Sequence, residues 1–342
     1  MLNHSYAVLL AFVAVIRLVL ALLLIIQSIR LLRTLHRRQL APIPSTPSDR
    51  YYFLALSASL LLTLNLTSWP LFYALLQRFV SEAPGIMCIY GVTRIGEGSL
   101  GPTRHLPLLI AILQLSKPLL VFIGGSWGHL HILNVRSATE PLLKKLVYIA
   151  VLFATAAVLD ATVELIYLSI PKVGESMSSG CCTVDRGDQF LPSGFLEGGH
   201  EPMLYAFFFG GIAALIAAIW IVTRNTRSVP STLAASAVFL GALAVTAIGV
   251  VFLVDVAAPR LLRLPFHHCP YDLPMRVPES LVTIAIFIAG NMCIGWLWTT
   301  RAFGTHSDTM PQMPAYLGSL ARIAIWCYGV STLMLAVEMA LA

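Results

Sequence analysis

The densest run of side chains that bind metals or change redox state is the segment 266–272, which reads Phe-His-His-Cys-Pro-Tyr-Asp. Thiolate and imidazole together are ligands of zinc and copper(I). A thiol beside imidazoles is also suited to thiol–disulfide exchange, because a nearby imidazolium favours the thiolate. The pattern therefore predicts His267, His268 and Cys269 as metal ligands, and solvent-facing histidines are the plainer alternative.

Six cysteines are present, and four of them lie in polar connecting segments: Cys88, Cys181, Cys182 and Cys269. No CxxC or zinc-ribbon spacing occurs. One interpretation is a catalytic redox site made by these four thiols. The other is structural: in an oxidising compartment four such cysteines are good disulfide candidates. Cys88 and Cys269 would then each bond to one member of the adjacent pair.

Charged residues inside apolar stretches are the sharpest signal in the chain: Arg17, Lys117, Asp160 and Glu164. Asp160 and Glu164 are four residues apart and therefore share one helix face. A charge at membrane depth costs several kcal/mol or more unless it is paired, so we expect opposite charges at matched depth to meet. The four residues are predicted to bind a cofactor or substrate, such as a quinone head group, or to carry protons. A buried structural ion pair is the alternative.

The elements that must hold these residues are membrane helices. Of the 342 residues, 58% are hydrophobic and only 11% are charged, whereas a soluble domain carries about 25% charged residues. Mean hydropathy is +0.82. A bilayer core needs about 20 apolar residues per helix, and eight continuous apolar stretches meet this requirement. They are 7–33, 51–79, 105–131, 145–170, 202–223, 232–254, 279–299 and 317–341.

The predicted fold is therefore an all-α integral membrane protein, a single polytopic domain over residues 1–342. The stretches are not alternating, so a β-barrel is not expected. An arginine cluster, Arg30 to Arg38, directly follows the first stretch and favours the cytoplasmic side for that loop. Both termini and the loops 80–104, 171–201 and 255–278 then face the outer, periplasmic or extracellular side of the plasma (inner) membrane. Their cysteines and histidines would form a cap on the outer face of the bundle.

Several classes are not favoured. Intramembrane haem b needs paired histidines within helices, but His105, His129 and His131 all lie near helix ends. We see no nucleic-acid motif, and the positive net charge of +6 is explained by membrane orientation. No internal repeat is evident. The inner halves of the helices carry few ionisable groups, which favours a site at the outer face over a complete pore.

These observations lead to three hypotheses. The first is a redox protein, thiol- or quinone-linked, or a soft-metal protein that handles copper or zinc at the outer face. The second is a non-catalytic anchoring or assembly subunit of a larger membrane complex, with its cap held by disulfides. The third is a secondary transporter that uses the intramembrane lysine and carboxylates. In all three the lipid bilayer is the main partner, and other membrane subunits are additional candidates.

Overall fold

The computed structural model describes residues 5–38, 49–81, 86, 88–97, 99–137, 139–171, 201–224, 229–264 and 267–342. Helices dominate these residues, and no strand occurs among them. In chain order the helices are α1 (Ser5–Arg38), α2 (Asp49–Val80), α3 (Ile89–Thr93), η1 (Pro102–His105), α4 (Leu106–Val135), α5 (Leu143–Ser169), α6 (Glu201–Thr223), α7 (Thr232–Phe252), η4 (Leu253–Ala257), α8 (Ala258–Leu261), α9 (Leu273–Arg276), α10 (Glu279–Phe303) and α11 (Met313–Leu341).

Within the described residues, eight helices are long and apolar enough to cross a membrane. They coincide with the eight predicted stretches, so the prediction of an all-α multi-pass membrane bundle is confirmed. The ends differ by a few residues. The largest difference is in the sixth stretch, which was predicted to end at 254. The helical span instead runs from α7 through η4 and α8 to Leu261. The short helices α3, η1, η4, α8 and α9 were not predicted, because each is too brief to give a periodic pattern.

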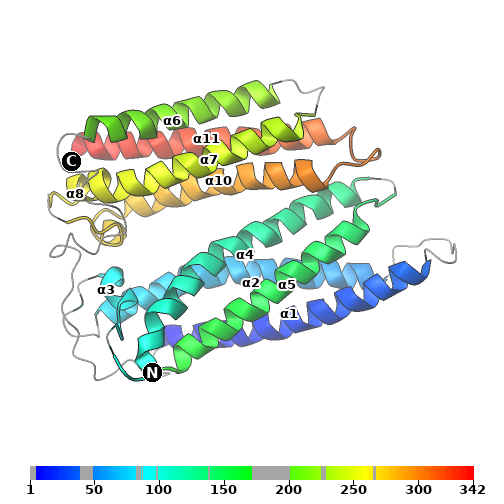
Figure 1. Cartoon of the computed structure of the whole chain (residues 1–342), viewed down its shortest axis with the longest axis horizontal. Helices are drawn as coiled ribbons and strands as arrows, with labels where there is room; N and C mark the ends of the chain where they lie inside the picture. Colours follow the sequence, from blue (N-terminus) through cyan, green and yellow to red (C-terminus); the bar gives the residue numbers. More distant parts are fainter. Residues whose placement is uncertain are drawn as a thin grey trace. The chain divides into compact units, whose positions relative to one another are not determined.

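The contacts between helices group into two units, Met1–Ser178 and Ser179–Ala342, which we call unit 1 and unit 2. Unit 1 is a bundle of four long helices in which α1 packs against α2 and α5, and α4 packs against the same two helices (Figure 1). Buried residues on α1 recur at alternating spacings of three and four: Leu10, Ala14, Arg17, Ala21, Leu24, Ser28 and Leu31. A spacing averaging 3.5 residues is that of helices packed at a small crossing angle.

Unit 2 repeats this arrangement with α6, α7, α10 and α11, where α10 packs against α7 and α11, and α6 packs against the same two. Its core is rich in aromatic rings: Phe208 stacks on Phe252 with ring centroids 4.6 Å apart. Midway along the helices, Asn291 Oδ1 accepts hydrogen bonds from Thr246 Oγ1 (2.9 Å) and from Tyr328 (3.0 Å). Among the described residues, the polar centre of this unit is therefore uncharged.

Each unit carries a small cap between its second and third long helices. In unit 1 the cap contains α3 and η1, and in unit 2 it contains η4, α8 and α9. The η4 segment is a turn of π-helix, a feature found often at functional sites because its wider turn redirects the backbone. We call the end of each bundle that holds the cap its cap end.

Candidate functional site

The most concentrated chemistry lies in the middle of unit 1, where three helices contribute four charged side chains to the core. Arg17 comes from α1 and Lys117 from α4, while Asp160 and Glu164 come from α5. All four side chains are buried, at 2% exposure or less. We call these four residues the charge cluster. The prediction that the opposite charges meet is confirmed.

Every cation in the charge cluster contacts every anion. Arg17 donates to Glu164 at 2.7 Å and also forms an ion pair with Asp160. Lys117 Nζ lies 3.2 Å from Asp160 Oδ2 and 2.8 Å from Glu164 Oε1. Two positive and two negative charges thus form a closed and neutral network. Such a balance is what makes burial of four charges affordable in a medium without water.

Hydroxyl groups complete this network. Ser68 of α2 accepts hydrogen bonds from Arg17 Nη1 at 2.9 Å and from Lys117 Nζ at 2.7 Å. Ser116, next to Lys117 on α4, donates to the second oxygen of Asp160. Ser68 and Ser116 were missed by sequence reasoning, which searched only for ionisable groups. The available signal was the position of Ser68 on the buried stripe of α2, between Asn65 and Phe72. Ser116 lies beside the buried stripe of α4 and gave no such signal.

Aromatic side chains cover the charge cluster on the side of the cap end. Lys117 Nζ lies 5.6 Å from the centre of the Phe72 ring, which is within reach of a cation–π attraction. The edge of Phe72 in turn meets Tyr167, with ring centroids 6.2 Å apart. Phe72 is one helical turn beyond Ser68 on α2. These rings add an apolar lid above the charges and help to keep water out.

The predicted Cys/His loop lies in the cap of unit 2, and its two histidines have different partners. His267 Nε2 is 2.8 Å from Asp272 Oδ2, and both side chains are buried. His268 instead turns to η4: its Nδ1 donates to the Val254 carbonyl at 3.2 Å and lies 3.8 Å from Asp255. The adjacent imidazoles therefore do not meet the same carboxylate.

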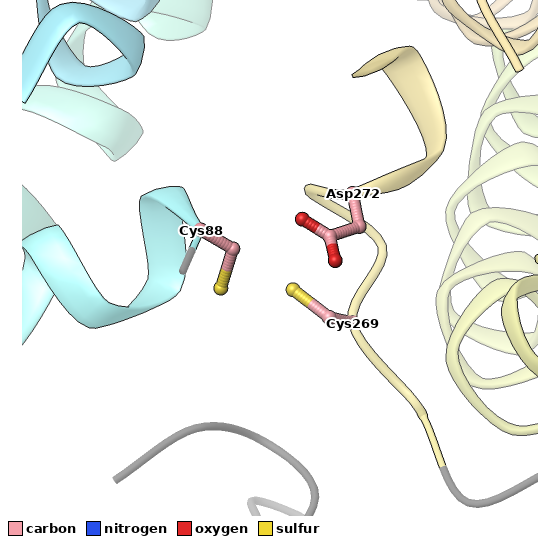
Figure 2. A group of neighbouring side chains, drawn as sticks. All are labelled: Cys88, Cys269 and Asp272. Carbon is pink, nitrogen blue, oxygen red and sulfur yellow. The ribbon is translucent and has the colours of Figure 1, made fainter. Parts of the chain in front are cut away.

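Cys269 lies between these histidines and α9 and is fully buried. Its sulfur is within 4.8 Å of a carboxylate oxygen of Asp272. The two side chains project from the same side of the loop that enters α9 (Figure 2). Asp272 thus contacts His267 and approaches Cys269. Sequence reasoning noted this aspartate in the segment but did not include it in the site.

The other predicted thiols do not lie in the cap of unit 2 among the described residues. Cys88 is buried at the start of α3 in the cap of unit 1 (Figure 2). Cys181 and Cys182 lie outside the described residues. The disulfide pattern proposed for these cysteines therefore stays a prediction, as does the outer-facing orientation of the caps.

Comparisons of the chain with protein-family models, with curated proteins and with solved structures find no match. The function must therefore be argued from the chemistry of the two sites.

Proposed function

We propose that the chain is a secondary transporter in which protons bind at the charge cluster of unit 1. The observation that supports this is the closed network in which both cations contact both carboxylates inside membrane-spanning helices. Apolar side chains of similar volume hold helices together at least as well as buried ion pairs do. Ionisable groups at membrane depth therefore point to a function, and proton relays are one such function.

The network is suited to proton binding because its neutrality depends on all four charges. A proton added to Asp160 or Glu164 leaves one positive charge in excess and removes one of the two carboxylate charges that pair with Lys117. Lys117 is the natural moving part, since its charge sits on a flexible four-carbon stem. Pro118, which follows it, cannot donate a backbone hydrogen bond, and this weakens α4 at that point. Protonation would thereby shift the balance between two conformations of the bundle.

Proton uptake into liposomes tests this function. Purified protein would be reconstituted with a pH-sensitive dye inside, and a potassium-diffusion potential, negative inside, would drive protons inward. We expect the wild-type protein to acidify the lumen faster than protein-free liposomes do, and we expect Asp160→Asn to lose this activity. Glu338→Gln is the matched control, because Glu338 is a part-buried carboxylate of unit 2 that bonds to Thr283 rather than to a cation in the described residues.

A second variant covers the case in which Asp160→Asn does not fold. Glu164→Asp keeps the charge but shortens its reach, so it should fold and slow proton uptake. Wild-type liposomes that take up no more protons than empty ones would contradict the proposal. So would Asp160→Asn protein that is folded and transports at the wild-type rate.

The cap of unit 2 supports a second candidate function, thiol redox chemistry or soft-metal handling at Cys269. The supporting observation is that Asp272, hydrogen-bonded to His267, lies within 4.8 Å of the Cys269 sulfur. A carboxylate–imidazole pair can accept the thiol proton, and thiolate with imidazole suits zinc or copper(I). Metal analysis and thiol alkylation of wild-type and Cys269→Ser protein test it, with Cys293→Ser in α10 as the control.

A bound soft metal or a reactive thiol that Cys269→Ser abolishes and Cys293→Ser leaves intact would establish the cap site. Identical metal content and thiol reactivity in wild-type and Cys269→Ser protein would rule it out. Stable co-purifying membrane proteins, with neither proton uptake nor cap chemistry, would favour the anchoring or assembly role instead.

A further inference from the structure

The core of unit 1 contains a second polar level beyond the charge cluster, toward the end opposite the cap. Ser28 on α1 and Trp127 on α4 are buried at 0% and 1% exposure. They lie 11 residues beyond Arg17 and 10 beyond Lys117, which places both about 15 to 17 Å along the bundle from the cluster. The sequence interpretation of a dry inner half considered only ionisable groups and missed this level.

The second level contains polar atoms that the described residues leave without partners. Neither Ser28 Oγ nor Trp127 Nε1 has a hydrogen-bond partner among them. Nearer the charge cluster, one turn from Ser68 on α2, Asn65 Oδ1 has none either. Buried polar groups in proteins are nearly always hydrogen-bonded, to protein or to water. Three such atoms in one bundle core are therefore natural sites for water that enters during function.

The second level connects to the far end of the bundle. The Trp127 ring stacks on the ring of His131, with centroids 5.1 Å apart and planes 8° from parallel. Nδ1 of His131 is 2.7 Å from the hydroxyl of Tyr51 at the start of α2. His131 is only partly buried. An imidazole and a phenol, both able to pass protons, thus lie between Trp127 and the end of unit 1.

An apolar layer separates the two polar levels. Seven residues beyond the cluster on every helix the side chain is apolar or absent: these positions are Leu24, Leu61, Gly124 and Phe153. The Phe153 ring fills the space beside Gly124, because a Cβ placed at Gly124 would lie 2.8 Å from Phe153 Cζ. The same Cβ would lie 2.8 Å from Leu62 Cδ1. The layer therefore has no room for a water molecule beside Gly124, where Phe153 and Leu62 meet the helix.

We infer that the interior of unit 1 is a gated proton path, with Phe153 as the gate. Protons would pass between the charge cluster and Tyr51–His131 by way of water held at Asn65, Ser28 and Trp127. An apolar constriction blocks such a path by excluding water, and it opens when the ring moves aside. This inference rests on the proposed function, since it names the route by which the cluster exchanges protons with one side of the membrane.

Shrinking the gate tests the inference in the same liposome assay. Phe153→Ala should raise the rate of proton uptake about tenfold, because the gap admits water between the polar levels. Phe252→Ala is the matched control: it deletes an equally buried ring from unit 2 and should leave the rate unchanged. Ser28→Ala with Trp127→Phe should slow uptake, because the second level loses its polar atoms. Phe153→Leu, a smaller change, serves if the alanine variant does not fold.

The outcomes separate this inference from the proposed function. Uptake that depends on Asp160 but is unchanged by Phe153→Ala or Phe153→Leu, and by the Ser28/Trp127 double variant, would overturn the gated path and leave the transporter proposal in place. An equal increase in Phe252→Ala would also overturn it, since the effect would then come from loosened packing in general. An absence of Asp160-dependent uptake would overturn both.

Discussion

The four long helices follow the same order around the bundle in unit 1 and in unit 2. The polar groups at the centre differ, because they are charged in unit 1 and neutral among the described residues of unit 2. The charge cluster of unit 1 draws on α4 and α5, and the corresponding helices of unit 2, α10 and α11, supply Asn291 and Tyr328. Asn291 accepts hydrogen bonds from Thr246 and Tyr328, and no ion pair lies there among the described residues. A neutral network is thus sufficient to hold this arrangement of helices. This arrangement of helices does not by itself call for charged groups at its centre, which favours a functional role for the charges of unit 1.

The caps of the two units are also similar, because each contains a cysteine followed two residues later by a tyrosine. In unit 1 the cap helix α3 follows Cys88, with Tyr90 two residues later. In unit 2 the segment that enters α9 has Cys269, with Tyr271 two residues later. Both cysteines are buried. Among the described residues, Cys269 has a hydrogen-bonded histidine–aspartate pair, His267 and Asp272, in its own segment.

Removal of one charge from unit 1 should have the largest effect. Lys117→Met leaves two carboxylates against one cation in a dry core, and we expect it to lower the free energy of unfolding by about 3–5 kcal/mol. Unfolding in detergent with increasing SDS measures this. The double variant Lys117→Met/Glu164→Gln restores neutrality and should lose less than the sum of the two single variants. Additive losses would mean that the network is not coupled.

A larger side chain at Gly124 should give the next largest loss of stability. A second glycine of the same helix, Gly128, serves for comparison. Gly124→Ala places a methyl group 2.8 Å from both Leu62 and Phe153, so we expect a loss of about 1–3 kcal/mol. A Cβ at Gly128, one turn along α4, meets nothing within 4 Å. Gly128→Ala should therefore be neutral or stabilising by up to about 1 kcal/mol, because alanine favours helix. Equal melting temperatures for the two variants would contradict the tight layer.

The neutral centre of unit 2 should respond more weakly. Tyr328→Phe removes one of the two hydrogen bonds to Asn291 Oδ1 and leaves the one from Thr246. We expect a loss of about 1 kcal/mol in the unfolding free energy, the usual net value of such a bond. Proton uptake should be unchanged, since this residue lies outside the charge cluster. A loss as large as that of Lys117→Met would remove the contrast between the units.

The smallest effect is expected at the surface pair of the unit 1 cap. Hydrogen bonds from the Arg94 guanidinium lower the pKa of the Glu97 carboxyl below its ordinary value. A lowered pKa in the folded state means that the pair stabilises the protein above the carboxyl's unfolded pKa and stops doing so as pH falls through the folded one. Both side chains are partly exposed, at 34% and 55%, so the contribution is about a few tenths of a kcal/mol.

Melting temperatures of wild-type and Glu97→Gln protein at neutral and acidic pH measure this contribution. The two proteins should differ slightly at neutral pH and converge in acid. A difference in melting temperature that grows as the pH falls would contradict the lowered pKa of Glu97.

The amino-acid sequence alone determined the number and placement of the long helices, because only a continuous apolar stretch of about 20 residues can cross a bilayer. It also determined that Arg17, Lys117, Asp160 and Glu164 must meet, since an unpaired charge at that depth is too costly. Only the tertiary structure decided that both cations contact both carboxylates, that Ser68 joins them, and that Phe153 closes the core one heptad away. These features depend on which helices are neighbours and on where their side chains point, which no local sequence pattern specifies. The same holds for the two histidines of the cap, because these adjacent residues of one type have different partners, Asp272 for His267 and the Val254 carbonyl of η4 for His268.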